Sequence, residues 1–180
     1  RPLQGIFLPV ATPFDSNGGL YPAKLRHNLE KWSRTGISGY VVGGPVGESA
    51  ALTGEEKLEL LSLAAAGAAA SGKLLIAAAM ELAVREAAKL AGHAASLGYQ
   101  ALLVAAPSCY CDPAVRELYF RAAADQCCLP VIVSRQPVDV TARLARHPNI
   151  VAAVAASDDG IPALKPHLAV LTASETELWA

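Results

Sequence analysis

The sequence predicts an α/β protein built on a parallel sheet, and two observations carry this prediction. The run Gly39-Tyr40-Val41-Val42 contains aromatic and β-branched residues without polar alternation, which indicates a strand buried on both faces. Short apolar runs of this kind then alternate with helical patterns along the whole chain. Their spacing, roughly 20 to 35 residues per strand-helix unit, fits either a (β/α)8 barrel or a doubly wound sheet.

The elements follow one another without a linker or a long low-complexity tract. Strands are predicted where apolar runs end in glycine or proline, over residues 5–14, 38–43, 73–79, 101–106, 130–133, 150–155 and 168–171. Helices are predicted where apolar residues recur at helical spacing, over residues 22–35, 53–71, 83–97, 113–125 and 141–146. This organisation predicts a single domain over residues 1–180.

A glycine-rich turn follows the strand at 38–43. Gly43, Gly44 and Gly47 allow the backbone to turn sharply and to approach a ligand. Thr53 and Glu56 then have the spacing of a capping box at the start of a helix. Because helix starts and glycine turns present backbone N–H groups, we expect an anion-binding corner here.

Composition excludes several classes of protein. Hydrophobic residues make up 53% of the chain, charged residues 17%, and the formal net charge is −1, so nucleic acid is not an expected partner. No apolar run reaches the roughly 18 residues of a membrane span, and no signal-peptide pattern is present. We therefore expect a cytoplasmic protein that does not bind a membrane.

The four cysteines are arranged as Cys109-x-Cys111 and Cys127-Cys128. Neither spacing is typical of a zinc site or a disulfide framework, so they are interpreted as free core or loop thiols. Asp158 and Asp159 in a glycine loop are interpreted as solvated turn residues, and the four histidines, which lack a spaced carboxylate or cysteine partner, as structural. We expect neither a metal nor a cofactor.

Several short motifs, placed at strand ends or helix starts, occur in a defined order. They are Ala11-Thr12-Pro13-Phe14, Gly44-x-x-Gly47-Glu48, Leu52-Thr53-x-Glu55-Glu56, Leu129-Pro130-Val131-Ile132 and His147-Pro148-Asn149-Ile150-Val151. Over nearly the whole chain they resemble the signatures of the dihydrodipicolinate synthase/N-acetylneuraminate lyase family. The resemblance implies a (β/α)8 TIM barrel, oligomers built from dimers, and class I aldolase chemistry on pyruvate or a related 2-oxo acid.

The same resemblance implies two catalytic side chains that this sequence lacks. The family's Schiff-base lysine falls on Val154, five residues after Asn149, and a valine has no amine to condense with a 2-oxo group. The family's proton-relaying tyrosine falls on Ser134, whose hydroxyl is a far weaker acid. Lys165, about a turn past the sixth strand, is the only conceivable substitute for the lysine.

The substrate-binding positions implied by the resemblance include Thr12, Gly44, Val46 and Gly47, with Tyr110 in the loop after the fourth strand as a residue that relatives often share across a dimer. Pro45 and Val46 replace the usual small polar residues, so only the amides of Val46 and Gly47 remain as anion donors. Arg135 is the positive charge expected near the pocket mouth, where it is a candidate for binding a substrate carboxylate.

The chain is short for the barrel that it resembles. Such barrels take about 250 residues, whereas these 180 residues end within the seventh strand-helix unit, and the links at 137–147 and 159–168 are also short. We therefore expect a TIM barrel truncated after about the seventh strand, with two open edges that invite pairing with another chain.

Two functional hypotheses follow. The first is a lyase or aldolase that acts on pyruvate or a hydroxylated 2-oxo acid but is catalytically impaired or inactive. The second is a non-catalytic barrel homologue that assembles as a homo-oligomer or with an active paralogue, or that binds a small carboxylate. A doubly wound cofactor-binding domain is a distant third, because the turn after Gly43 lacks the spacing of a dinucleotide fingerprint.

Overall fold

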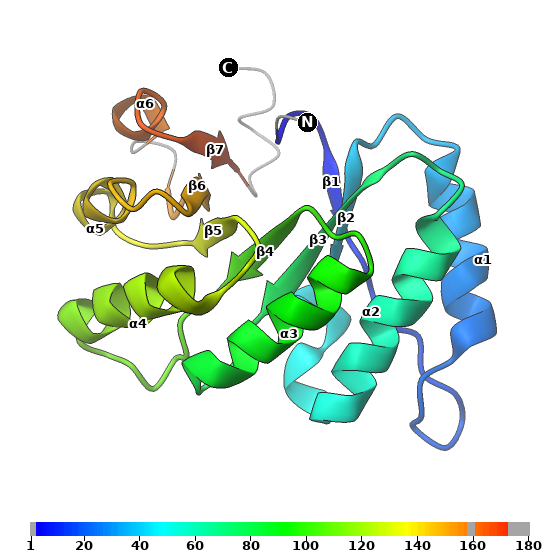
Figure 1. The fold of residues 1–180 in the computed structure, drawn as a ribbon. Coiled ribbons are helices and arrows are strands. Elements are labelled where there is room, and N and C mark those ends of the chain that lie inside the picture. Colours follow the sequence, from blue (N-terminus) through cyan, green and yellow to red (C-terminus); the bar gives the residue numbers. More distant parts are fainter. Residues whose placement is uncertain (1–2, 158–160, 173–180) are drawn as a thin grey trace.

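A single parallel sheet organises the computed structural model, which describes residues 3–157 and 161–172 (Figure 1). Its strands are hydrogen-bonded in sequence order, each to the next. They are β1 (Phe7–Pro9), β2 (Gly39–Val42), β3 (Leu74–Ala79), β4 (Ala101–Val104), β5 (Val131–Ser134), β6 (Ile150–Val154) and β7 (Ala169–Leu171).

Helices connect the strands and lie outside the curved sheet, with α1 to α4 forming a continuous layer (Figure 1). The α-helices are α1 (Pro22–Ser33), α2 (Gly54–Ala68), α3 (Val84–Ser96), α4 (Pro113–Gln126), α5 (Val138–Leu144) and α6 (Ile161–Leu164). Two short 3-10 turns, η1 (Pro45–Gly47) and η2 (Ser49–Ala51), lie between β2 and α2.

The strand order decides between the two predicted architectures. A doubly wound sheet reverses its strand order at a switch point, whereas a barrel adds each strand beside the last. The observed order runs from β1 to β7 without reversal, and β1 and β7 are the edge strands of the described sheet. The truncated TIM barrel predicted from the sequence is therefore confirmed.

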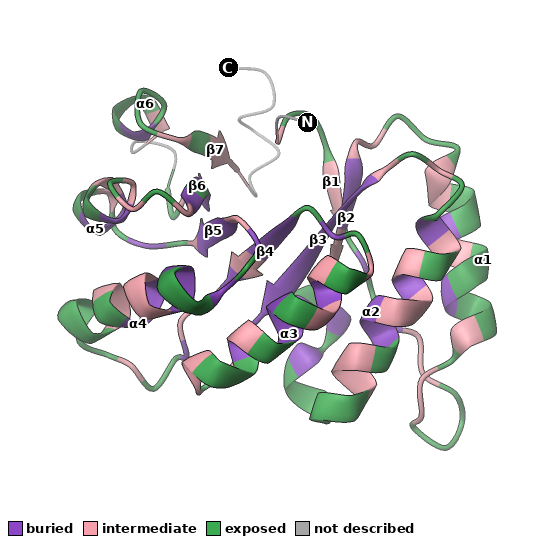
Figure 2. Cartoon of the chain, in the orientation of Figure 1, coloured by how far each residue is buried: buried purple, intermediate pink, exposed green. Residues whose placement is uncertain are grey.

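The hydrophobic core has two parts. Buried residues are concentrated on the strands and on the sides of the helices that face the sheet (Figure 2). The larger part fills the space between the strands and the helices and includes Leu29, Tyr40 and Phe120, all fully buried. The smaller part faces the barrel axis. It comprises buried Ile76, Ala101, Ile132 and Ala152, with partly buried Leu3, Phe7, Val41, Leu103, Val154 and Leu171 packed against them. Several side chains on the barrel axis are thus only partly covered.

Local sequence signals explain how α2 and α5 begin. The predicted capping box of α2 is confirmed, since Glu56 N donates to Thr53 Oγ1 at 3.2 Å and Thr53 N donates to Glu56 Oε2 at 2.8 Å. The prediction for α5 is wrong at its start, because this helix begins at Val138 and not at Thr141. Pro137 precedes it with a φ of −52°, and the Thr141 hydroxyl donates to the Pro137 carbonyl at 3.0 Å, so the first turn forms directly after the proline.

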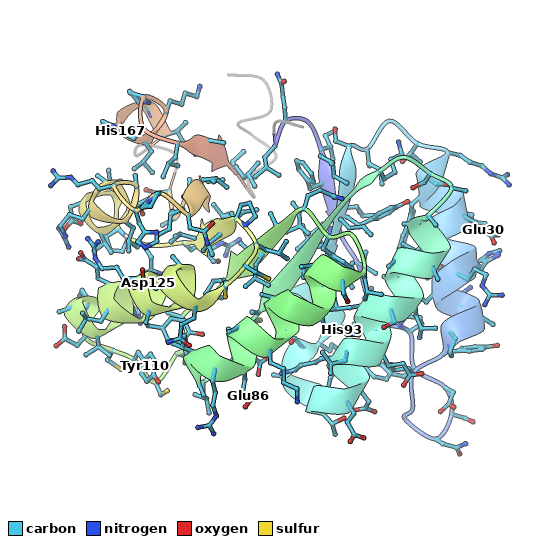
Figure 3. All side chains as sticks on the ribbon, in the orientation of Figure 1. Glu30, Glu86, His93, Tyr110, Asp125 and His167 are labelled. Carbon is cyan, nitrogen blue, oxygen red and sulfur yellow. The ribbon has the colours of Figure 1, made fainter. Side chains whose placement is uncertain are left out.

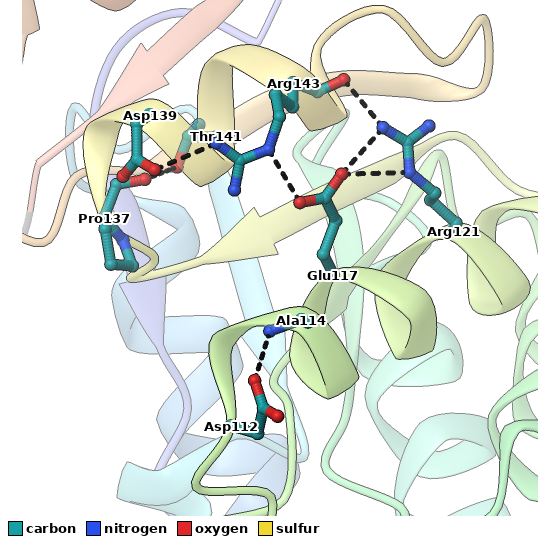
Figure 4. A network of polar contacts seen from close by, with 8 residues as sticks. All are labelled: Asp112, Ala114, Glu117, Arg121, Pro137, Asp139, Thr141 and Arg143. Carbon is teal, nitrogen blue, oxygen red and sulfur yellow. Dashed lines mark hydrogen bonds and ion pairs between the residues drawn. The ribbon is translucent and has the colours of Figure 1, made fainter.

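An ion network on the outer surface joins α4 to α5 (Figure 4). The Glu117 carboxylate accepts from Arg143 Nε at 2.8 Å and from Arg121 Nη2 at 2.9 Å, and Arg143 Nη1 also reaches Asp139 at 2.9 Å. Hydrogen bonds from Arg143 and then from Arg121 lower the pKa of Glu117 below its usual value. The network holds α5 against its neighbour, and α5 leads from β5 to β6.

Candidate active site at the carboxyl ends of the strands

Most of the candidate residues from the sequence lie where the parallel strands end, the edge of a barrel sheet that carries active sites. Thr12 follows β1, the turn of Gly44 to Gly47 follows β2, and Ser134 and Val154 are the last residues of β5 and β6. The sheet therefore gathers these positions at one rim.

A buried hydrogen bond ties the first two segments of this rim together. Thr12 is 6% exposed, and its hydroxyl donates to the Gly47 carbonyl at 2.6 Å. A side chain at Gly47 would place its Cβ 2.8 Å from the Val10 carbonyl oxygen and 3.1 Å from Thr12 Oγ1. Only glycine fits at this approach without displacing backbone, so the turn is packed directly on the end of β1.

The expected anion-binding corner is mostly occupied by the protein's own groups. The Gly47 amide donates to the Gly44 carbonyl at 3.0 Å inside the 3-10 turn, so the expectation that it remained available was wrong. Of the two amides that were expected to bind an anion, only that of Val46 is left, and the Val46 side chain is 56% exposed. At the start of α2, the carboxylate of Glu56 already supplies the anion, and its hydrogen bonds from Thr53 lower its pKa.

Ser134 and Val154 are direct register partners across the β5–β6 ladder. Each follows a buried barrel-axis residue by two positions, Ile132 and Ala152 respectively, so both face the axis. Val154 packs on the inner cluster and Ser134 is half-buried. This pair offers a hydroxyl beside an aliphatic surface, a combination that can accept or donate a hydrogen bond but cannot form an imine.

Two residues after Ser134 shape the rim further. Arg135 is exposed and has a left-handed φ of 42°, and its backbone N–H donates to the Val154 carbonyl at 3.0 Å. Gln136 is 6% exposed, and its Nε2 donates to the carbonyls of Ser134 at 2.8 Å and Arg135 at 3.1 Å. These two hydrogen bonds from Gln136 hold the backbone at the end of β5 in place. Sequence reasoning missed it, because a glutamine between an arginine and a proline gives no signal that it is buried.

Tyr110 lies in the loop after β4, near the start of α4 (Figure 3). Its hydroxyl donates to the Leu82 carbonyl at 3.0 Å, and its ring packs edge-on against Tyr119 with centroids 5.7 Å apart. These contacts fix Tyr110 against the loop that follows β3. In the described residues no hydrogen bond or ring contact brings it to Ser134 or Thr12.

None of the described lysines stands on a strand of the sheet. Lys165 is exposed in the turn between α6 and β7, just before the amino end of β7, so its proposed role as a substitute for the Schiff-base lysine is not supported by its position. Lys57 pairs with Glu81 at 2.7 Å. Lys73 donates to backbone carbonyls, including that of Ile37 at 2.6 Å, and lines an open hollow at the amino ends of β1 to β3, opposite the candidate site.

Two of the four histidines, His93 and His147, hold chain segments together. His93 Nε2 lies 2.9 Å from Ser62 Oγ and links α3 to α2 (Figure 3). The expectation that no histidine has a carboxylate partner was wrong for His147, whose Nε2 lies 2.9 Å from Asp125. Because the Asn149 N–H donates to His147 Nδ1 at 3.2 Å, Nε2 carries the proton toward Asp125. This pairing closes the turn before β6 and engages both ring nitrogens of His147.

Within residues 3–157 and 161–172 no group of three or more histidine, cysteine or acidic side chains is arranged to hold a metal. The acidic pair Asp158 and Asp159 lies outside the described residues. Of the helices that the structure describes, none is long and apolar enough to cross a membrane.

Comparison with known proteins decides the family. The model of the dihydrodipicolinate synthetase family matches residues 2–171. The chain belongs to this family. A 4-hydroxy-tetrahydrodipicolinate synthase from Methanothrix thermoacetophila is 35% identical over 164 residues, which cover 86% of this chain and 54% of the relative. An N-acetylneuraminate lyase from Rhizobium meliloti is 35% identical over 167 residues, covering 87% and 55%.

Solved structures of the family agree in fold. A chloride-inhibited dihydrodipicolinate synthase from Acinetobacter baumannii, complexed with pyruvate, superposes with a TM-score of 0.86 at 27% identity, covering 94% of this chain and 63% of that one. The enzyme from Aquifex aeolicus gives a TM-score of 0.84, also at 27% identity. The chain spans about half the length of the curated relatives that it matches.

The names of the relatives indicate which reactions the family carries out. The relatives that match this chain are named for a synthase and a lyase reaction. In this member of the family, the ends of β5 and β6 carry Ser134 and Val154, and the described lysines lie elsewhere. Both positions to which the resemblance assigned catalytic side chains therefore lie on neighbouring strands at the rim.

Proposed function

We propose that this member of the dihydrodipicolinate synthetase family binds a small 2-oxo acid such as pyruvate at the carboxyl ends of its strands, without forming a covalent imine. It is a catalytically impaired form of a lyase or aldolase. The observation that carries the proposal is the register pair of Ser134 and Val154, which puts a hydroxyl and an aliphatic side chain at two adjacent strand ends facing the barrel axis.

The rim retains groups that suit a carboxylate. Arg135 is an exposed cation next to Ser134, and an arginine can bind a carboxylate with two parallel hydrogen bonds. The Ser134 hydroxyl can donate to a 2-oxo group. The pyruvate complex of the Acinetobacter baumannii relative supports this choice of ligand, because that structure shares the fold of this chain. Without an amine on β6, binding is reversible and the neighbouring carbon is not activated.

Two measurements test this function together. Saturation-transfer NMR with pyruvate should show binding, whereas acetate, which lacks the 2-oxo group, should give a weaker signal. Borohydride treatment in the presence of pyruvate should leave the intact mass unchanged. A borohydride-stable adduct on any lysine would overturn the non-covalent reading, and an absent pyruvate signal would overturn binding itself. Arg135→Gln, which removes the charge at an exposed position, should weaken the pyruvate signal.

The edge strands of the described sheet favour a second role, assembly with another copy of this chain or with an active paralogue. β1 and β7 are edge strands in the described sheet, and the axis-facing Val41, Leu103 and Leu171 are only partly covered. Unpaired strand edges and exposed apolar surface both favour association. Native mass spectrometry of the chain, alone and co-expressed with a full-length paralogue, tests this role. A monomer under both conditions would contradict it.

A further inference from the structure

Two thiols flank Tyr110 in the loop that leads from β4 to α4. Cys109 and Cys111 are both exposed and both free. Neither takes part in the function proposed above, and the Cys111 thiol donates only a long hydrogen bond of 3.9 Å to the Ser108 carbonyl of its own loop. The pair differs from an isolated surface thiol because the backbone between the two cysteines is folded into a tight turn.

Two consecutive backbone hydrogen bonds define this turn. Tyr110 N donates to the Pro107 carbonyl at 3.0 Å, and Cys111 N donates to the Cys109 carbonyl at 3.1 Å. The second bond spans three residues and closes a γ-turn, which draws its first and third residues together. A disulfide requires Cα atoms within about 4.4 to 6.8 Å of each other, and a three-residue turn brings its ends into that range.

Hydrogen bonds with neighbouring segments also hold this turn in place. Arg116 Nε, in the first part of α4, donates to the Tyr110 carbonyl between the two cysteines. The Tyr110 hydroxyl is bound to the Leu82 carbonyl, and Asp112, directly after Cys111, caps α4 through a 2.8 Å bond from the Ala114 N–H. The two thiols therefore stand on a preorganised turn, beside a guanidinium and a helix amino end that favour the approach of an anionic oxidant.

We propose that Cys109 and Cys111 form a redox-active dithiol that closes to an intra-loop disulfide by exchange with a small anionic disulfide such as oxidised glutathione. One protein thiolate attacks the small disulfide, forms a mixed disulfide and releases one small thiolate. The second protein thiolate then attacks the protein sulfur of that mixed disulfide and releases the other. The two protons lost by the protein are taken up by the two released thiolates, so one disulfide is reduced as one is formed.

The other two cysteines do not offer this chemistry. Cys127 is buried, and burial raises its pKa to about 11, which keeps it as an unreactive thiol. Cys128 is exposed but has only that buried neighbour beside it in the chain. Exchange at Cys128 should therefore stop at the mixed disulfide, and this residue serves as an internal reference for accessibility.

Closing the disulfide has a structural consequence for the rim. Tyr110 lies between the two cysteines in the sequence, and its ring and hydroxyl contact Tyr119 and Leu82. A covalent ring across Tyr110 restricts the backbone of the loop after β4, one of the loops at the carboxyl ends of the strands. The dithiol is thus a modification site whose oxidation can alter one of the loops at the rim.

The experiment uses the reduced chain, oxidised glutathione as the probe, and alkylation followed by peptide mapping. The second thiol acts at an effective concentration on the order of millimolar, so reduced glutathione is kept well below that level. We expect a peptide with Cys109 and Cys111 joined, lighter by two hydrogen atoms than its reduced form, and glutathione retained on Cys128. Cys109→Ser and Cys111→Ser should each retain glutathione on the remaining loop thiol, whereas Cys128→Ser should leave the loop disulfide unchanged.

Three results would overturn the proposal. These are glutathione persisting on Cys109 or Cys111 in the unmodified sequence, either of them pairing with Cys128, or both remaining alkylatable when Cys128 is already glutathionylated. The test on the unmodified sequence does not depend on any variant folding. Thermal melts followed by circular dichroism check that each serine variant keeps the fold, which is expected because both loop side chains are exposed.

Discussion

The Thr12 hydroxyl donates a 2.6 Å hydrogen bond to the carbonyl of Gly47, across 35 positions of sequence. Both residues are buried, and the bond joins the segment after β1 to the turn after β2. It therefore fixes the relative position of two segments of the candidate rim before any ligand is present.

Replacing Thr12 with valine should destabilise the protein by about 1 to 3 kcal/mol, because the Gly47 carbonyl is left buried without its donor while the side-chain shape is kept. Urea unfolding followed by circular dichroism measures this change. Thr12→Ser is the matched control, since it retains the hydroxyl and should lose less stability. A larger loss of stability for Thr12→Ser than for Thr12→Val would show that packing of the methyl group, and not the hydrogen bond, dominates.

Gly47→Ala should cost about 1 to 3 kcal/mol of stability, because the new Cβ would lie too close to the Val10 carbonyl for the backbone to stay in place. Gly92→Ala is a suitable control. Gly92 lies on an exposed part of α3, where an added Cβ meets nothing within 4 Å. That substitution should stabilise the helix by about 0.5 to 1 kcal/mol, and opposite signs in the two unfolding curves would confirm the close approach at Gly47.

The double substitution Val154→Lys with Ser134→Tyr should restore trapping of pyruvate by borohydride, since it places an amine beside a phenol at adjacent strand ends. Intact mass and peptide mapping should locate the adduct on residue 154. Each single substitution serves as a control, and Val154→Lys alone should trap more slowly because it lacks the proton relay. Failure of the double variant to trap, while it remains folded, would mean that the pocket has diverged beyond these two positions.

Glu117→Gln should lower stability at neutral pH by roughly 0.5 to 1 kcal/mol, the upper part of the range for exposed ion pairs, because Glu117 joins two arginines. Its pKa is lowered in the folded state, first by Arg143 and then by Arg121. The unfolded chain therefore binds more protons as the pH falls, and the contribution of Glu117 is lost below the ordinary glutamate pKa of about 4.3.

Unfolding curves of Glu117→Gln and the unmodified sequence should consequently differ most at pH 7, and the difference should shrink as the pH falls below about 4.3. Glu30→Gln is the control. Glu30 is exposed on α1 without an ion pair among the described residues, and its substitution should change stability by less than about 0.5 kcal/mol. A constant difference for Glu117→Gln across this pH range would contradict the assigned role of its charge.

Local patterns in the sequence were sufficient to predict the alternation of strands and helices. The apolar run from Tyr40 to Val42 and the capping box of Thr53 and Glu56 depend on neighbours within a few positions, so their structures are specified by residues close in sequence. The order of the short motifs indicated the barrel and its family, and the family match over residues 2–171 confirmed it.

The tertiary structure decided which groups at the rim remain available. The Gly47 amide donates a hydrogen bond within its own turn, and Lys165 lies before the amino end of β7. His147 pairs with Asp125, which is 22 positions away in the sequence. Gln136 is buried although nothing in its flanking residues predicts this. These outcomes depend on contacts between segments far apart in sequence, which local periodicity does not encode. The sequence by itself determined the secondary-structure elements and the family. Tertiary packing determined which polar groups remain accessible at the carboxyl ends of the strands.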